Sequence, residues 1–256
     1  MLAEFSNLQL ISLGFLIFTA GFIDSLAGGG GLIALPAYFS VGLNPMLVLG
    51  TNKLSSCLGT VFSTGQYLVH VRLKLRAVLL EILICLLGAA LGTQIVLFIN
   101  PGFIRYLLLI LLPLISGVVY FHRDFGAEDR SQRYSSFQLL WRGLAISFII
   151  GTYDGFFGPG TGTFLALGFS RLCGYGLLQA TTRAKVLNLS SNISSLAVFL
   201  FAGRVHLPLG LLMATLSIMG HWLGARLGVG KGARAIRPMI LFVLMLLFLK
   251  LFWDIV

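Results

Sequence analysis

The sequence predicts an all-α, polytopic membrane protein built from two homologous halves. Three observations lead to this prediction: the composition is strongly apolar, long apolar stretches recur, and one pattern of glycines and a lysine occurs twice. Of the 256 residues, 57% are hydrophobic and only 10% are charged, and the mean hydropathy is +0.97. A soluble domain of this length could not cover so much apolar surface, because its own exterior must face water.

Eight apolar stretches are near or above the ~18 residues that a membrane-spanning helix needs. They cover residues 8–26, 46–70, 77–98, 104–121, 137–157, 177–202, 209–229 and 239–256. The N-terminus shows neither a basic run nor a small-residue cleavage site, so we expect no removed signal peptide. The sequence therefore predicts a multi-pass protein of the plasma membrane, which in a bacterium is the inner membrane.

The net charge of +10 comes mostly from lysines and arginines in the loops. This distribution predicts orientation by the positive-inside rule and contact with anionic membrane lipid. We expect no nucleic-acid partner, because the chain has no aromatic-interleaved basic segment and no soluble domain. The cysteines Cys57, Cys85 and Cys173 lie in or beside apolar segments without a CxxC spacing. They indicate packing residues, and we predict no disulfide framework, no metal site and no cofactor.

An internal repeat extends through the chain. Lys53 and Lys185 are 132 positions apart, and the same offset joins Gly28 with Gly160, Gly30 with Gly162, Gly88 with Gly220, Gly92 with Gly224 and Arg105 with Arg237. Asp24 and Asp154 are 130 positions apart, which implies two extra residues in the second glycine loop. Matches of charged residues in one register argue against chance. We predict transmembrane repeat 1 at residues 1–121, a polar connecting loop at 122–136 and transmembrane repeat 2 at 137–256.

Each half contains four long apolar segments and one short one, at residues 32–41 and 164–173. About a dozen helical residues rise only ~18 Å, which is too little for a ~30 Å membrane core. The short segments are therefore either re-entrant or parts of broken helices that cross. The count of basic residues favours crossing, because all three basic clusters then share one side. In that arrangement the two repeats are inverted and both termini lie outside.

The two glycine-rich loops are predicted to serve binding. Glycine lets the chain reverse at depth, and the helix that follows points its positive dipole end at a bound anion. Close helix packing is the alternative, but four consecutive glycines disrupt a helix more than packing requires. The loop residues of interest are Gly28, Gly29, Gly30, Gly31, Gly160 and Gly162. By contrast, Gly88-xxx-Gly92 and Gly220-xxx-Gly224 interrupt continuous apolar helices and predict packing contacts.

Lys53 and Lys185 lie inside long apolar segments. Burying an ammonium in lipid costs ~3 kcal/mol or more, so such a lysine usually faces a cavity. Snorkelling to the membrane surface is the alternative, and the matching positions in both halves favour the cavity. Amide and hydroxyl groups accompany both lysines and suit recognition of an oxyanion. The predicted substrate-binding residues are therefore Thr51, Asn52, Lys53, Lys185 and Asn188 together with the loop glycines.

Asp24 and Asp154 end the first long segment of each half, just before the glycines. They can cap the next helix, balance the lysines or take up protons during transport. The sequence favours capping or charge balance and leaves proton coupling as a hypothesis.

Other ionisable residues are assigned structural roles. We expect Glu81 to pair with the basic cluster around Arg76 at the membrane surface and Arg183 to snorkel. His221, the one deep histidine, is expected to form a helix-packing hydrogen bond. No nucleophile–base pair accompanies these residues, so the sequence predicts a protein that is not an enzyme.

The chain resembles the TauE/SafE family of sulfite and organosulfonate exporters over essentially its full length. The residues that carry the resemblance are those from Gly21 to Gly31, Pro36, Gly50 to Lys53, Gly158 to Gly162, Lys185 and Asn188. The second half is a looser match, with Arg183-Ala184-Lys185 in place of Thr51-Asn52-Lys53. The resemblance implies a permease for a small anion, typically sulfite or a sulfonate, working as a secondary exporter. A coupling proton or sodium ion and a homo-oligomer stay open, and the alternatives are a passive anion channel and a non-transporting membrane scaffold.

Overall fold

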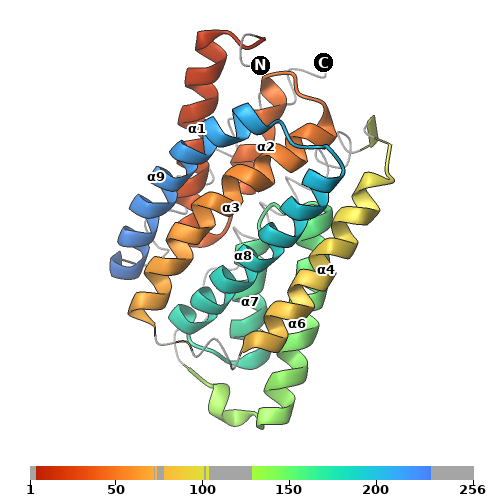
Figure 1. Ribbon diagram of the computed structural model, residues 1–256. Coiled ribbons are helices and arrows are strands. Elements are labelled where there is room, and N and C mark those ends of the chain that lie inside the picture. Colours follow the sequence, from red (N-terminus) through yellow and green to blue (C-terminus); the bar gives the residue numbers. More distant parts are fainter. Residues whose placement is uncertain (1–3, 72, 74–77, 101, 104–128, 232–256) are drawn as a thin grey trace.

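The computed structural model describes residues 4–71, 73, 78–100, 102–103 and 129–231. The helices with known bounds are α1 (Asn7–Ala27), α2 (Gly31–Ser40), α3 (Pro45–His70), α4 (Leu79–Leu97), α6 (Ser136–Phe156), α7 (Thr161–Cys173), α8 (Leu177–Phe201) and α9 (Leu207–Lys231), with a 3-10 turn at Ser131–Arg133 (Figure 1). Strands are absent from these described ranges, so the all-α prediction is confirmed there. The predicted spans at 104–121 and 239–256 and the basic residue Arg76 lie outside them.

Four helices, α1, α4, α8 and α9, are long and apolar enough to cross a membrane, among the residues that the structure describes. Their outer faces expose large apolar side chains. Leu8 is 77% exposed, Phe15 is 69% exposed and Leu87 is 59% exposed. Apolar surface of this extent fits a lipid environment, where it carries no hydration cost.

The helix ends follow local sequence signals. α1 begins with a capping box in which Ser6 and Gln9 satisfy each other's backbone N–H groups. α3 begins with Pro45 after Asn44, whose side chain accepts from the Met46 N–H group. α1 ends at Gly28, which adopts a left-handed backbone with φ of 77°. Glycine adopts this conformation without steric cost, so the turn into the glycine loop needs it.

The long helices run in two opposite directions (Figure 1). Helices α1, α3 and α9 run downward in that view, and α4, α6 and α8 run upward. The short helix α2 starts beside the last turns of α1, where the Gly30 N–H group donates to Asp24. It ends shortly before α3 begins at the upper end of the view. The glycine loop and α2 therefore return the chain to the end from which α1 started.

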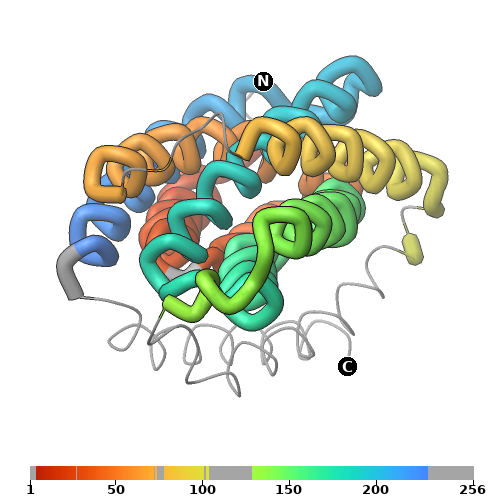
Figure 2. Tube along the Cα trace, turned by 90° about the horizontal axis from the view of Figure 1, so that it is seen from below, coloured from red at the N-terminus to blue at the C-terminus, as the bar shows by residue number. Residues whose placement is uncertain are grey.

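The two short helices are shielded from lipid. The side chains of Ile33, Leu35 and Tyr38 on α2 are fully buried, as are those of Leu165 and Phe169 on α7. Helix α8 packs against α3, α4, α6 and α7, and Figure 2 shows it between the first two and the last two. Non-helical backbone at membrane depth is tolerated only inside such a shell of protein. The broken segments of both halves thus lie at the centre of the bundle.

The GxxxG positions pack as predicted. A Cβ atom on Gly88 of α4 would lie 2.7 Å from the carbonyl oxygen of Phe148 on α6. A Cβ atom on Gly220 of α9 would lie 2.9 Å from the amide nitrogen of Phe22 on α1. Contacts this short leave no room for a side chain. The pairs α4–α6 and α9–α1 therefore each bring together a helix from one half and a helix from the other.

Candidate functional site

The two glycine loops meet at the centre of the bundle. A Cβ atom on Gly162 would lie 2.6 Å from the Cα atom of Gly28, and one on Gly31 would lie 3.0 Å from the Cα atom of Pro159. Gly160, which precedes α7, has a φ of 81° and so also favours glycine. The loops therefore cross backbone against backbone and bring the starts of α2 and α7 close together.

Lys53 forms a buried ion pair with Asp154. Its Nζ atom lies 2.8 Å from Asp154 Oδ2 and 3.0 Å from Asn192 Oδ1. The side chains of the lysine and the aspartate are only 6% and 3% exposed. The other carboxylate oxygen of Asp154 lies 2.7 Å from Thr161 Oγ1, at the first residue of α7. Charge-assisted hydrogen bonds of this kind hold both side chains in place.

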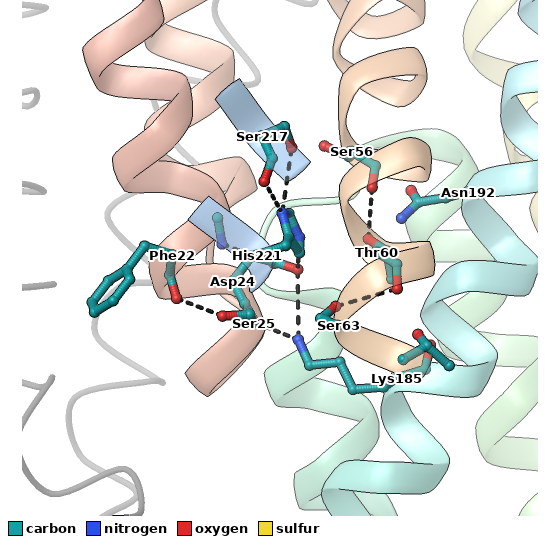
Figure 3. A network of polar contacts seen from close by, with 12 residues as sticks. Phe22, Asp24, Ser25, Ser56, Thr60, Ser63, Lys185, Asn192, Ser217 and His221 are labelled. Atoms are coloured by element: carbon teal, nitrogen blue, oxygen red, sulfur yellow. Dashed lines mark hydrogen bonds and ion pairs between the residues drawn. The ribbon is translucent and has the colours of Figure 1, made fainter. Parts of the chain in front are cut away.

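Lys185 forms the corresponding contact with Asp24. Its Nζ atom donates to the backbone carbonyl of Asp24 and lies 3.6 Å from Oδ2 of the same residue. Asp24 Oδ1 accepts from the N–H group of Gly30, at the start of α2. His221 completes this cluster, because its Nε2 atom lies 3.3 Å from Asp24 Oδ2 (Figure 3).

The pairing is crossed between the two predicted repeats. The lysine of predicted repeat 1 pairs with the aspartate of predicted repeat 2, and the lysine of predicted repeat 2 pairs with the aspartate of predicted repeat 1. Neither lysine reaches the membrane surface, so neither snorkels; Lys185 is among the most deeply buried large side chains. Burying a charge in this way is tolerated because an opposite charge and hydrogen bonds accompany it.

A small polar cavity lies between the two pairs. Its volume is about 30 Å³, which is room for about two water molecules. Helices α1, α2, α3, α6, α8 and α9 all contribute to its wall, so both halves enclose it. Its polar and glycine lining consists of Gly21, Asp24, Gly30, Gly31, Asn52, Lys53, Ser55, Ser56, Asp154, Gly158, Asn188, Asn192, Ser217 and His221.

Several predicted binding residues lie on this cavity. They are Lys53, Asn52, Asn188, Gly30 and Gly31, and both predicted aspartates line it as well. Lys53 donates two of its three N–H groups to Asp154 and Asn192, so one N–H group remains for a ligand in the cavity. The side-chain amide of Asn188 makes no hydrogen bond within the described ranges, which leaves it available to a ligand.

The remaining predicted residues lie outside the cavity lining. Thr51 points toward the start of α9, where its Oγ1 atom accepts from the His206 N–H group. Lys185 contacts Asp24, which does line the cavity. Gly28 and Gly162 contact each other. Gly29 and Gly160 belong to the loops that connect the long helices to the short ones.

Two polar side chains on the cavity, His221 and Asn192, were not among the predicted binding residues. Asn192 follows Asn188 by one helical turn, a spacing that places both on one face of α8. His221 follows Ser217 by the same spacing on α9, and its Nδ1 atom lies 2.9 Å from the Ser217 carbonyl oxygen. That bond lies within α9. The expected helix-packing hydrogen bond is the Nε2 contact with Asp24 on α1. The sequence carries no signal for this partner, because the contact joins residues 197 positions apart.

Glu81 and Arg183 form an ion pair that the sequence did not indicate. Nη1 of Arg183 lies 3.0 Å from both carboxylate oxygens of Glu81, and its guanidinium lies 4.4 Å from the centre of the Tyr175 ring. Arg183 therefore does not snorkel. The reason is tertiary: α4 and α8 pack together and bring these two buried side chains into contact. The expected contact of Glu81 with the cluster around Arg76 lies outside the described residues.

We expect Arg183→Lys to lower the stability of the protein by about 1–3 kcal/mol. A lysine keeps the charge, but it provides neither the planar guanidinium nor the stacking on an aromatic ring. The thermal midpoint of unfolding in detergent measures the effect. Arg171→Lys, at an exposed arginine on α7, is the matched control and should leave the midpoint unchanged. Equal midpoints for the two variants would contradict this role for the guanidinium.

The fold and the cavity define the class of the protein: a helical membrane bundle, apolar outside, whose centre holds charged and polar groups from both halves, as in membrane transporters. The profile of the family described as "Sulfite exporter TauE/SafE" matches residues 13–251. The chain belongs to this family. No solved structure matches the chain.

Curated relatives match over nearly their full length. A "Probable membrane transporter protein" from Haemophilus influenzae is 38% identical, with 97% of this chain and 96% of the relative covered. The "Probable membrane transporter protein YfcA" of Escherichia coli is 37% identical, with 98% and 94% covered. A "Probable membrane transporter protein ORF9" from Sinorhizobium sp. is 38% identical, with 93% and 90% covered. These matches and the apolar helices confirm an integral, multi-pass membrane protein of a transporter family.

The relatives' names are consistent with a protein that is not an enzyme. Within the described ranges, no group of three or more His, Cys, Asp or Glu side chains is placed to hold a metal ion.

Proposed function

We propose that the protein is a secondary transporter that exports a small anion, such as sulfite or an organosulfonate, through the central cavity. The single observation that carries this proposal is the buried Lys53, which faces a small cavity lined by amide and hydroxyl groups from both halves. The family description supports the class of anion.

The chemistry of the lining suits an oxyanion. Lys53 supplies a positive charge, and Asn52, Asn188 and Ser55 supply neutral polar groups. An anion that approaches Lys53 replaces part of its contact with Asp154. Without an anion, Lys53 and Asp154 therefore neutralise each other. Space for about two waters is too small for a sulfonate, and binding therefore requires the helices around the cavity to move apart.

We also propose that the two halves are inverted relative to each other, because inverted halves allow alternating access. Two observations support inversion: α1 and α3 run opposite to α6 and α8 (Figure 1), and equivalent residues make reciprocal contacts across the halves. Lys53 with Asp154 corresponds to Lys185 with Asp24. In transporters with inverted repeats, one bundle rocks against the other around a fixed central site.

A passive anion channel is the second candidate. The small volume of the cavity favours a carrier, since a channel needs a continuous wet path. Sulfite, sulfoacetate, sulfate and thiosulfate should therefore be tested in proteoliposomes for counterflow, in which external label accumulates against its gradient while unlabelled anion leaves. Accumulation of at least one of these anions supports a carrier, downhill flux alone indicates a channel, and no flux with any of them contradicts the proposed function.

We expect Asn188→Leu to reduce this counterflow at least tenfold while the protein stays folded. The substitution removes a cavity-facing amide, and it leaves no broken hydrogen bond behind because Asn188 has no side-chain partner in the described part of the chain. Loss of one well-placed hydrogen bond to a charged ligand typically costs about 1.5–3 kcal/mol. Leu178→Ala, at an exposed site on the same helix, is the control. Parent-like counterflow by Asn188→Leu would contradict the assignment of Asn188 to the binding site.

A further inference from the structure

His221 occupies a position that exists only once in the repeat. Its ring fits between two glycines: a Cβ atom on Gly21 of α1 would lie 2.7 Å from His221 Nδ1, and one on Gly59 of α3 would lie 2.8 Å from Cε1. At the offset of 132, the equivalent of His221 in the first half is Ala89. Asp154 therefore has no histidine in the corresponding place. The fold does not require an imidazole at either aspartate, so its presence at Asp24 calls for a functional reason.

The contacts of His221 allow an added proton to be shared with Asp24. Nδ1 lies 2.9 Å from the carbonyl oxygen of Ser217 and 3.3 Å from its hydroxyl oxygen, so it can donate to the first or accept from the second. Nε2 lies 3.3 Å from Oδ2 of Asp24. When Nδ1 carries the hydrogen, a neutral ring turns its Nε2 lone pair toward this carboxylate. One added proton, on Nε2 or on Asp24, then makes the contact a hydrogen bond.

Charged groups surround the ring from each helix packed against it. Asp24 faces it from α1 and Lys185 approaches the same carboxylate from α8. Lys53 and Tyr67 lie on α3, and Asp154 lies across the shared cavity on α6. On α9 itself, Arg226 points away and stacks on the Trp222 ring.

We propose that Asp24 and His221 form a proton-binding site, and that the bound proton crosses the membrane together with the transported anion. This inference rests on the proposed function and adds the coupling ion to it. The proton arrives from water in the central cavity, which both residues line, forms the Nε2–H bond of His221, and returns to water on the other side.

The sign of the coupling follows from the charges. With the proton bound, Asp24, Lys185 and His221 together carry one positive charge, and without it they are neutral. An anion in the adjacent cavity is therefore held more tightly when the proton is present, and by reciprocity it raises the affinity for the proton. Anion and proton load and leave together. A dianion with one proton still carries a negative charge, and a membrane potential negative inside drives it outward by about 2.3 kcal/mol per 100 mV.

The proton site can be tested without any anion. In protein labelled with ¹⁵N-histidine and carrying His70→Gln, His122→Gln and His206→Gln together, the one remaining signal belongs to His221. We expect the signals of this ring to change when a proton binds, and Asp24→Asn to alter that change, because the carboxylate shares the proton. His221→Gln should remove this signal from protein that keeps the other three histidines. Ring signals that do not change with pH, or that change alike in the parent protein and in Asp24→Asn, would overturn the assignment.

Coupling is tested by efflux of sulfoacetate from proteoliposomes that contain a pH-sensitive dye. The sulfonate and carboxylate groups of this anion stay ionised near neutral pH, so only the protein can carry protons. We expect the interior to become alkaline during efflux by the parent protein and by the control His70→Gln. His221→Gln should release sulfoacetate without this change, and its affinity for sulfoacetate should fall by about 5–150-fold, the usual range for coupled sites.

Parent-like alkalinisation by His221→Gln would overturn the coupling. If the parent protein moves neither sulfoacetate nor the other three anions, the proposed function fails, while the ¹⁵N experiment still decides the proton site. The two failures are therefore distinguishable.

Discussion

Lys53→Ala is expected to abolish anion counterflow and also to destabilise the protein by about 3–5 kcal/mol. The large loss of stability arises because the substitution leaves Asp154 charged and buried without its cation. From the sequence alone, the alanine variant is expected to lose transport but fold normally. The ion pair with Asp154 corrects that expectation. The thermal midpoint in detergent and counterflow in proteoliposomes measure the two effects.

The double variant Lys53→Gln with Asp154→Asn separates stability from function. It removes both charges and keeps polar groups of similar size, so most of the lost stability should return. Counterflow should stay absent, because no cation remains for the anion at this position. Parent-like counterflow by the double variant would show that Lys53 serves structure alone and would contradict its role in binding.

Gly162→Val is expected to destabilise the protein by about 3 kcal/mol or more. The new side chain would meet the backbone of Gly28, whose Cα atom lies 2.6 Å from the Cβ position. Backbone cannot move aside as a flexible side chain can, so the two short helices would have to separate. The thermal midpoint in detergent measures this effect.

The matched control is Gly65→Val on α3, where no atom lies within 4 Å of the Cβ position. This change should alter stability by less than about 0.5 kcal/mol, as surface substitutions usually do. Equal midpoints for Gly162→Val and Gly65→Val would contradict a close crossing of the glycine loops.

The helices are the part of the structure that the sequence predicted well. The apolar stretch at 46–70 corresponds to α3 (Pro45–His70), and that at 177–202 corresponds to α8 (Leu177–Phe201). Length and composition suffice there, because a membrane requires about twenty apolar residues and lets the backbone satisfy its hydrogen bonds only within the helix. The GxxxG contacts were predictable for a similar reason, since close backbone approach needs small residues at that spacing.

Partners across the bundle could not be predicted. The repeat indicated that Lys53 and Lys185 are equivalent, and it contained no information about which carboxylate each would meet. The contact of Glu81 with Arg183 could not be predicted either, because pairing depends on which helices pack together and not on distance along the chain. His221 was assigned to packing for the same reason.

The sequence differences between the two predicted repeats have structural counterparts. Thr51 accepts a backbone hydrogen bond, whereas its equivalent Arg183 forms an ion pair with Glu81. Lys53 contacts Asn192, whereas the lysine of the second half shares its aspartate with a histidine. Under our proposal the two ion pairs have different roles. The pair of Lys53 and Asp154 binds the anion, and Asp24 with His221 binds the proton.

The crossed ion pairs also bear on how the chain is made. Lys53 precedes Asp154 by 101 positions, and Asp24 precedes Lys185 by 161. At ~5–20 residues per second, ribosomes need about 5–20 s to reach the partner of Lys53. During that time, the nascent first half holds an acid and a base whose partners have yet to be synthesised. The centre of the protein is therefore completed late in translation, once the partners of both charges have been synthesised.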